Sequence, residues 1–346
     1  MFLASDNTGP AHPTVMARIN AANENYAMPY GADLIMDEVR AQIRHIFEAP
    51  EAAVFLVATG TAANALALAT YVQPYQTVFC SPVAHIHEDE CNAPEFYSAG
   101  AKLTLVPGGH KMTPDALRAA IAAEESRGVH GPQRGPVSIT QVTERGGVYD
   151  LETLTALAKV AKAHNLPVHL DGARFANALV KLGCTSAEMT WKAGVDVVSF
   201  GGTKNGCMGV EAVVFFDPEK AWEFELRRKR GAHLFSKHRY LSAQMAGYLQ
   251  DDVWLDCARA ANAKAARLAA GLKAQGVRML YEPEANMMFP VFPRRVHKRL
   301  HDAGAKYYVW EGTLEGRDPE EELAARLVCD WSLPDDQIDK FLSHFE

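Results

Sequence analysis

The sequence lacks the features that mark several classes of protein. No apolar run approaches the roughly 20 residues that a membrane-spanning helix needs. Basic residues are in deficit, with 35 Lys and Arg against 42 Asp and Glu and a net charge of -7. This balance argues against nucleic acid or an acidic membrane surface as a partner. Residues 1–6 contain no basic region and no long apolar stretch, so we expect no signal peptide.

Cysteines are few and follow no pairing pattern. The chain has six of them, none in CxxC spacing, and it has no internal repeat and no low-complexity linker. Free thiols in a reducing compartment explain this distribution better than disulfides or a zinc site. We therefore expect a cytoplasmic protein whose cysteines are unpaired.

The chain has ample apolar material for a large core. Its 346 residues are 48% hydrophobic and 22% charged, and this length predicts one large domain with a smaller one. Short apolar runs, typical of buried strands, alternate with helical patterns at 61–70, 114–125 and 151–164. The alternation indicates an α/β fold with a mainly parallel sheet flanked by helices, in which ligands bind at the carboxyl ends of the strands. The predicted strands lie at 53–58, 78–80, 103–106, 137–140, 167–170, 195–200 and 212–216.

The pattern changes after about residue 240. A long Ala-rich helix is predicted at 254–275, followed by shorter strands and helices. We therefore assign residues 1–240 to an N-terminal segment and a large domain, and residues 241–346 to a small C-terminal α/β domain. The strands of the small domain are predicted near residue 279 and at 287–292, 307–310 and 327–330, and its further helices at 295–303 and 335–345.

Two predicted strands end in an ionisable residue. Asp171 follows the strand at 167–170, and Lys204 follows the strand at 195–200 and a turn of small residues. Pyridoxal 5'-phosphate (PLP) needs such a pair, because a lysine forms a Schiff base with its aldehyde and a carboxylate keeps a proton on its pyridine nitrogen. The alternatives are a surface lysine and, for Asp171, the N-cap of a helix at 173–182. Together the two residues favour PLP chemistry.

The helix predicted after the first strand begins at Thr59-Gly60-Thr61. A helix N-terminus offers free N–H groups and a partial positive charge, which suit a phosphate. Gly60 lets the backbone come close to a ligand, and Thr61 adds a hydroxyl group. A helix start that is merely capped is the alternative.

A histidine follows the strand at 78–80. The imidazole of His85 could stack on a cofactor ring and act as a base, because its pKa lies near neutrality. A solvated polar loop is the competing interpretation. His85 and His87 offer HxH spacing without a clear third ligand, so we expect no metal site.

Two arginines are candidates for binding anions. Arg174 lies three residues after Asp171 and could face the phenolate oxygen of the ring, or be a solvated helix arginine. Arg326 is predicted at the start of the last strand, and its guanidinium suits a substrate α-carboxylate. Its alternative is a surface arginine, with Arg317 as the second candidate for the role.

Taken together, these motifs resemble the threonine aldolase family of fold-type-I PLP-dependent enzymes, and most of all its bacterial low-specificity L-threonine aldolase branch. The resemblance covers nearly the whole chain and is carried by segments 5–7, 30–33, 60–64, 84–86, 169–174 and 199–206. It implies a reversible retro-aldol cleavage of the Cα–Cβ bond of L-threonine, L-allo-threonine and related β-hydroxy-α-amino acids, giving glycine and an aldehyde. Another PLP reaction (β-elimination, transamination or racemisation) and a non-catalytic binding protein are the alternatives.

The resemblance also implies roles for single residues and an assembly. Lys204 would be the Schiff-base lysine, Asp171 would bind the pyridine nitrogen, and His85 would stack on the ring. A homotetramer built from dimers is implied, with sites shared between subunits. The remaining implied contacts are Gly60 and Thr61 to the phosphate, Lys237 of a neighbouring subunit to the cofactor, Arg174 near the phenolate oxygen, and Ser5, Tyr30, Arg174 and Arg326 around the substrate.

Two positions depart from the better-known members of the family. Glu144 stands where those members have a second histidine, and Asp89 stands where they often have an aromatic residue. That histidine is a candidate contact to the substrate β-hydroxyl group. Without that histidine, the base that acts on the β-hydroxyl group could be His85 or Asp89, with His87 as a weaker candidate. The preference between threo and erythro substrates is also left open.

Overall fold

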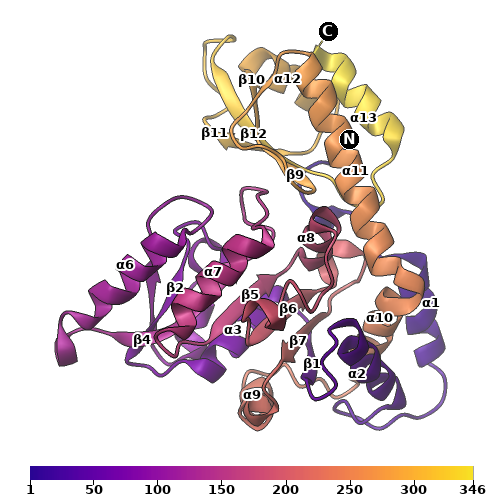
Figure 1. Ribbon diagram of the computed structural model, residues 1–346. Coiled ribbons are helices and arrows are strands. Elements are labelled where there is room, and N and C mark those ends of the chain that lie inside the picture. Colours follow the sequence, from indigo (N-terminus) through magenta and orange to yellow (C-terminus); the bar gives the residue numbers. More distant parts are fainter. Residues whose placement is uncertain (346) are drawn as a thin grey trace.

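The computed structural model describes residues 1–345. A seven-stranded sheet forms the centre of the large domain, in the order β1-β7-β6-β5-β4-β2-β3 (Figure 1). The pairs from β3 to β6 are parallel, whereas β7 is antiparallel to both β6 and β1. The prediction of a mainly parallel sheet is confirmed. The strands are β1 (Ala53–Val57), β2 (Gln76–Cys80), β3 (Lys102–Leu105), β4 (Gln133–Thr140), β5 (Val168–Gly172), β6 (Val197–Gly201) and β7 (Glu211–Phe215).

Helices cover both faces of this sheet. Side chains alternate between the faces of a strand, so neighbouring residues pack into different cores. Val197 of β6 packs in a cluster with α3 and α9, whereas Val198 packs in the larger cluster with α6 and α7. The helices of the large domain are α1 (Pro13–Ala22), α2 (Leu34–Ile46), α3 (Gly60–Tyr71), α4 (His85–Glu88), α5 (Ala93–Tyr97), α6 (Pro114–Glu125), α7 (Leu151–Lys162), α8 (Phe175–Leu182), α9 (Ala221–Arg230) and α10 (Arg239–Leu249).

The small domain is built on an antiparallel sheet in the order β11-β12-β10-β8, with β9 also paired to β12. The single strand predicted at 287–292 is wrong, because β9 and β10 are separate. Pro290 has no N–H to donate, and the pairing with β12 is interrupted beside it. The elements are α11 (Val253–Ala274), β8 (Arg278–Met279), β9 (Met287–Met288), β10 (Pro290–Pro293), α12 (Arg294–Asp302), β11 (Tyr308–Glu311), β12 (Glu322–Val328) and α13 (Asp335–Leu342).

The two ends of the chain lie by the small domain, and α11 runs from it to the large domain (Figure 1). Leu3 packs in the core of the small domain; its N–H donates to the carbonyl of Lys306 at 2.8 Å, and its carbonyl accepts from the N–H of Val328 at 2.9 Å. The N-terminal segment therefore connects the small domain to residues 5–7 beside the site. The division between residues 240 and 241 stays a prediction.

All six cysteines are free, as the sequence analysis predicted. Among the helices of residues 1–345, none is both long enough and apolar enough to cross a membrane.

Candidate active site

A cavity of about 340 Å³ lies at the carboxyl ends of β5 and β6, beside the start of α3. This is the edge of the sheet at which the strand pattern predicted a ligand. The cavity brings together residues that are far apart in the sequence. Its walls include Gly60, Thr61, His85, Asp171 and Lys204 of the predicted set, together with Asn7, Ala58, Thr59, Asn64, Ala173, Thr203, Met208, Gly209 and Glu211.

Lys204 reaches the cavity from a short 3-10 turn, Thr203–Asn205, directly after β6. Burial lowers the pKa of its amine, and the charge of Arg174 lowers this pKa further, while Asp6 and Asp171 act in the opposite direction. A lowered pKa increases the fraction of neutral amine, which is the nucleophilic form. The lysine therefore has the environment that covalent bonding to an aldehyde requires.

Asp171 is a buried residue of β5. Its Oδ1 accepts from the N–H of Ala173 at 3.0 Å, and its Oδ2 accepts from Nδ2 of Asn64 at 2.9 Å. The alternative interpretation as a helix N-cap is wrong, because Asp171 still belongs to the strand and α8 starts only at Phe175, after Arg174. The carboxylate is fixed on two sides at the wall of the cavity.

The start of α3 leaves room for an anion. Thr59 caps the helix, and its Oγ1 accepts from the N–H of Ala62 at 3.2 Å. The N–H groups of Gly60 and Thr61 belong to the first turn, which has no intrahelical acceptor. A Cβ atom at Gly60 would meet no atom within 4 Å, so open space adjoins the backbone there.

His85 begins α4, and its ring lies at the cavity wall. Its Nδ1 lies 2.8 Å from Oε1 of Glu90, whose side chain is fully buried. Burial acts to lower the pKa of His85, but the hydrogen bond with Glu90 and the charge of Asp171 outweigh it, and the net pKa is raised. The backbone N–H of His85 donates to Oε1 of Glu144 at 2.7 Å.

Glu144 is partly buried beside His85. Burial, and then the charge of Asp171, raises the pKa of its carboxyl group to about 7. Its Oε2 has no hydrogen-bond partner in the described chain. Glu144 is therefore a carboxyl group with a pKa near neutrality.

Arg174 is buried and paired. Its guanidinium donates to Asp6 from Nε at 2.7 Å and from Nη2 at 3.1 Å, and Nδ2 of Asn286 donates to the same carboxylate at 3.1 Å. Ser5 caps the short helix Asp6–Thr8, and its Oγ accepts from the N–H of Asn7 at 3.1 Å. Arg174 is therefore not the solvated helix arginine of the alternative interpretation.

Arg326 lies within β12, paired with Tyr308, and not at the start of that strand as predicted. Arg326 itself interrupts the apolar pattern of β12, so the prediction missed the earlier residues of this strand, which pair with β10 and β11. Burial lowers the pKa of Arg326, and so does the charge of Arg174, while Asp6 and Asp89 raise it. The two arginines are thus close to each other. Arg317, the second candidate, is exposed.

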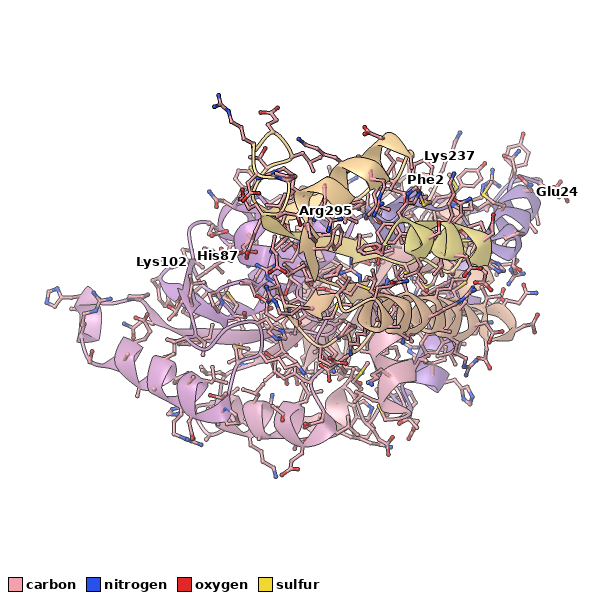
Figure 2. All side chains as sticks on the ribbon, turned by 90° about the horizontal axis from the view of Figure 1, so that it is seen from above. Phe2, Glu24, His87, Lys102, Lys237 and Arg295 are labelled. Atoms are coloured by element: carbon pink, nitrogen blue, oxygen red, sulfur yellow. The ribbon has the colours of Figure 1, made fainter. Side chains whose placement is uncertain are left out.

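Asp89 and His87 are exposed at the end of α4 and are not part of the cavity wall. Lys237 is exposed too, and His87 and Lys237 are well separated when the molecule is seen from above (Figure 2). The predicted site residues that do not line the cavity form three groups. Asp89 lies at the end of α4, Ser5 belongs with Arg174 and Arg326, and Tyr30 belongs with Lys237.

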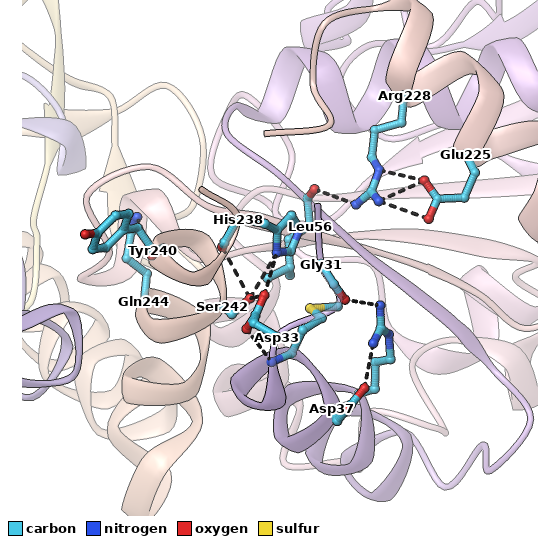
Figure 3. A network of polar contacts seen from close by, with 12 residues as sticks. Gly31, Asp33, Asp37, Leu56, Glu225, Arg228, His238, Tyr240, Ser242 and Gln244 are labelled. Carbon is cyan, nitrogen blue, oxygen red and sulfur yellow. Dashed lines mark hydrogen bonds and ion pairs between the residues drawn. The ribbon is translucent and has the colours of Figure 1, made fainter. Parts of the chain in front are cut away.

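Tyr30 and Lys237 lie near each other, outside the cavity wall. The N–H of Tyr30 donates to the carbonyl of Ser236 at 3.2 Å. Lys237 is the next residue in the sequence, so both predicted residues lie at this backbone contact. A buried polar network lies close by in the sequence, at Asp33, His238 and Ser242 (Figure 3). In it, Oγ of Ser242 donates to Oδ2 of Asp33 at 3.3 Å and lies 3.0 Å from Nδ1 of His238.

Sequence reasoning assigned no role to Asp6, Asn64 or Glu90, which fix the site residues. Asp6 and Asn64 lie in segments that carry the family resemblance, but polarity alone does not show which partner a side chain meets. Asn64 had a usable signal: it is a polar residue in an Ala/Leu-rich helix, four positions after Gly60 and thus on the same helix face.

Among the described residues, no three His, Cys, Asp or Glu side chains are grouped so that they could hold a metal ion.

Comparison with known proteins identifies the family. The sequence pattern of the beta-eliminating lyase family matches residues 3–293. Low specificity L-threonine aldolase from Pseudomonas aeruginosa is 41% identical over 331 residues, which cover 95% of this chain and 92% of that protein. The protein of the same name from another Pseudomonas species is 39% identical over 338 residues, covering 97% of this chain and 94% of that protein.

Solved structures agree on the fold. Threonine aldolase from Leishmania major superimposes with a TM-score of 0.92 at 24% identity, covering 99% of this chain and 98% of that chain. A serine palmitoyltransferase from S. paucimobilis with bound PLP has a TM-score of 0.71 at 18% identity, covering 100% of this chain and 86% of that chain. The chain has the fold of fold-type-I PLP enzymes and, as its motifs predicted, belongs to the low-specificity L-threonine aldolase family.

Proposed function

We propose that this protein is a PLP-dependent aldolase that cleaves the Cα–Cβ bond of L-threonine, L-allo-threonine and related β-hydroxy-α-amino acids to glycine and an aldehyde. The proposal rests on the observation that Lys204, Asp171, His85 and the start of α3 all line the same cavity. Two relatives that carry the name of this activity are 39% and 41% identical over nearly the whole chain.

The residues around the cavity fit PLP. The open space beside Gly60 and the free N–H groups of the first turn of α3 suit its phosphate. Lys204 has a desolvated amine for the aldehyde, and Asp171 has a fixed carboxylate for the pyridine nitrogen. When bound, PLP supplies a heterocycle that takes up the electron pair released by bond cleavage.

Asp171 makes that electron uptake effective by holding a proton on the ring nitrogen. The N–H of Ala173 and the amide of Asn64 keep its two oxygens in place. A buried carboxylate held in this way needs no rearrangement when charge develops nearby.

Arg326 and Arg174, with Ser5, would hold the substrate carboxylate. Arg174 is already paired with Asp6, whereas Arg326 forms no ion pair among the described residues, so its guanidinium is the one left for a substrate carboxylate. When the carboxylate of the substrate is held in place, the bond that is cleaved is oriented and the entropic cost of the reaction falls.

His85 is our candidate base for the β-hydroxyl group. Its ring lies at the cavity wall, whereas Asp89 is exposed and lies outside that wall. The neutral form of an imidazole can remove a proton.

We further propose a cytoplasmic homotetramer built from dimers, in which Tyr30 and Lys237 complete the site of a neighbouring subunit. Both residues lie outside the cavity wall of their own chain and flank the same backbone contact at Ser236. Six unpaired cysteines are consistent with a reducing compartment.

A product assay tests the function. Purified protein reconstituted with PLP is incubated with L-threonine, and acetaldehyde, glycine, ammonia and 2-oxobutyrate are measured. The proposal predicts acetaldehyde and glycine in equal amounts. Ammonia with 2-oxobutyrate would instead identify β-elimination, and no product from any β-hydroxy amino acid would favour a binding protein.

A further inference from the structure

Glu90 is a buried carboxylate whose contacts lead to two residues of the cavity wall. Its side chain has no exposed surface, and its Oε1 lies 2.8 Å from Nδ1 of His85. Ionised carboxylates are rarely buried without compensation, because desolvation is costly. The partners of this carboxylate are therefore informative.

Asn64 joins Glu90 to Asp171. Its Nδ2 donates to Oε1 of Glu90 at 2.9 Å and to Oδ2 of Asp171 at 2.9 Å. An amide nitrogen has two hydrogens, so both are used. The hydrogen bonds form an unbroken series from Asp171 of β5 through Asn64 of α3 and Glu90 to His85 of α4.

We propose that Glu90 and Asn64 are positioning residues of this aldolase, which hold the proton of His85 on Nδ1 and leave the lone pair of Nε2 free to take the β-hydroxyl proton. The inference rests on the proposed function. Burial raises the pKa of Glu90, while its hydrogen bonds with His85 and Asn64 act in the opposite direction and favour the ionised form. An ionised carboxylate only accepts, so the ring nitrogen that faces it then carries a hydrogen. The other nitrogen is then the basic one, as in other carboxylate–histidine pairs.

The same contact assists proton transfer. As the Cα–Cβ bond breaks, the electron pair of the β-hydroxyl O–H bond forms the second bond of the product carbonyl group. The proton of that hydroxyl group moves to Nε2 of His85. The imidazole then becomes a cation, which Glu90 stabilises from the Nδ1 side. Asn64 holds Glu90 in place and connects it to the carboxylate that serves the ring nitrogen.

Four ionisable groups act on His85. Glu90 contacts its ring, Glu144 accepts from its backbone N–H, and Asp171 and Lys204 act through their charges. Glu90 is the only acidic group among the described residues that forms an ion pair with the ring. Its removal should therefore change the titration of His85 more than any other single change.

The test uses 15N-labelled histidine in the PLP-loaded protein, with the His85 signals assigned by comparison with His85→Asn. In the wild type we expect the hydrogen on Nδ1. In Glu90→Ala the hydrogen should move to Nε2, the usual tautomer of a free imidazole. In Glu90→Gln, whose amide oxygen still accepts, the hydrogen should stay on Nδ1, but the pKa of His85 should fall.

Kinetics give the second readout. Both variants should lose about 10- to 100-fold in kcat with little change in KM, the usual effect of losing an orienting partner. In Glu90→Gln the acid limb of kcat/KM should move to lower pH, because His85 loses the charge that raises its pKa. Glu88→Gln, an exposed neighbour paired with Arg145 at 3.4 Å, is the matched control and should behave as wild type.

The outcomes separate the two proposals. An unchanged tautomer in Glu90→Ala, with an unchanged His85 pKa in Glu90→Gln, would overturn the inference even in an active aldolase. If the tautomer and pKa move as expected but no variant and no wild-type sample cleaves threonine, the positioning stands and the proposed function fails.

Discussion

The guanidinium of Arg174 donates two hydrogen bonds to the carboxylate of Asp6, residues that are 168 positions apart in the sequence. Both side chains are buried, at 7% and 1% exposure. The contact ties the N-terminal segment, which packs on the small domain, to the turn that follows β5. The geometry of the candidate carboxylate site therefore depends on how the two domains meet.

Asp6→Asn should destabilise the protein, because it leaves the buried charge of Arg174 uncompensated. Breaking such a pair from one side costs about 3–5 kcal/mol. Urea unfolding at neutral pH measures the change. Asp37→Asn, which breaks the exposed pair with Arg40, is the control and should cost less than about 1 kcal/mol. Equal effects of the two variants would contradict a structural role for the buried pair.

The pair also predicts acid sensitivity. Burial would raise the pKa of Asp6, but Arg174 and Lys204 outweigh it and the net pKa is lowered. A lowered pKa stabilises the folded state above the unfolded value of about 3.9, and the stabilisation is lost as the pH falls through the folded pKa. Below that range, wild type and Asp6→Asn should differ less in free energy of unfolding than they do at neutral pH.

Arg326→Ala should weaken the use of substrate. A charged hydrogen bond of about 1.5–3 kcal/mol corresponds to a loss of about 10- to 150-fold in kcat/KM. Steady-state cleavage of L-threonine measures this loss. Arg317→Ala is the matched control, since Arg317 is exposed on the segment before β12 and should leave kcat/KM unchanged. A larger loss of kcat/KM in Arg317→Ala than in Arg326→Ala would indicate that Arg317 contacts the substrate carboxylate instead.

Glu144→Gln should stabilise the protein at high pH. Its folded pKa of about 7 lies above the ordinary value of 4.5, so ionisation opposes folding. The wild type should lose stability as the pH rises from 4.5 through 7, by up to about 3 kcal/mol, and the variant should lose less. Thermal unfolding between pH 5 and pH 8.5 tests this, and identical pH profiles of the two proteins would contradict a carboxyl group that titrates near neutrality.

Shared sites predict complementation between inactive chains. Lys204→Ala and Lys237→Ala should each be impaired, and their co-expression should restore part of the activity. A mixed dimer would contain one site with both native residues. Co-expression of Lys204→Ala with Asp171→Ala is the control, because those residues belong to the same chain's site. Restoration in the control, or none in the first pair, would contradict the proposed sharing.

The sequence predicted the large domain well, because its strands are buried on both faces and read as short apolar runs. α6 has the bounds that its pattern predicted, and β5 and β6 lie within two residues of theirs. Other elements were harder to predict. The charged Arg326 interrupts the apolar pattern of β12, and only the last two residues of that strand, Leu327 and Val328, lie in the predicted strand. α1, α2 and α10 were not assigned either.

The candidate site was predictable where chemistry restricts residue type, and not where packing decides. Asp171 and Lys204 follow from the needs of PLP and from their place after buried strands. Glu90 did not follow, because its importance comes from the amide of Asn64, a hydrogen-bond donor that it shares with Asp171, and no sequence spacing encodes that contact.

The most direct test of the account is covalent trapping. The PLP-loaded protein is reduced with borohydride, digested, and mapped by mass spectrometry. We expect a phosphopyridoxyl group on Lys204, and no colour or turnover in Lys204→Ala. A label on a different lysine, or full aldolase activity in that variant, would contradict it.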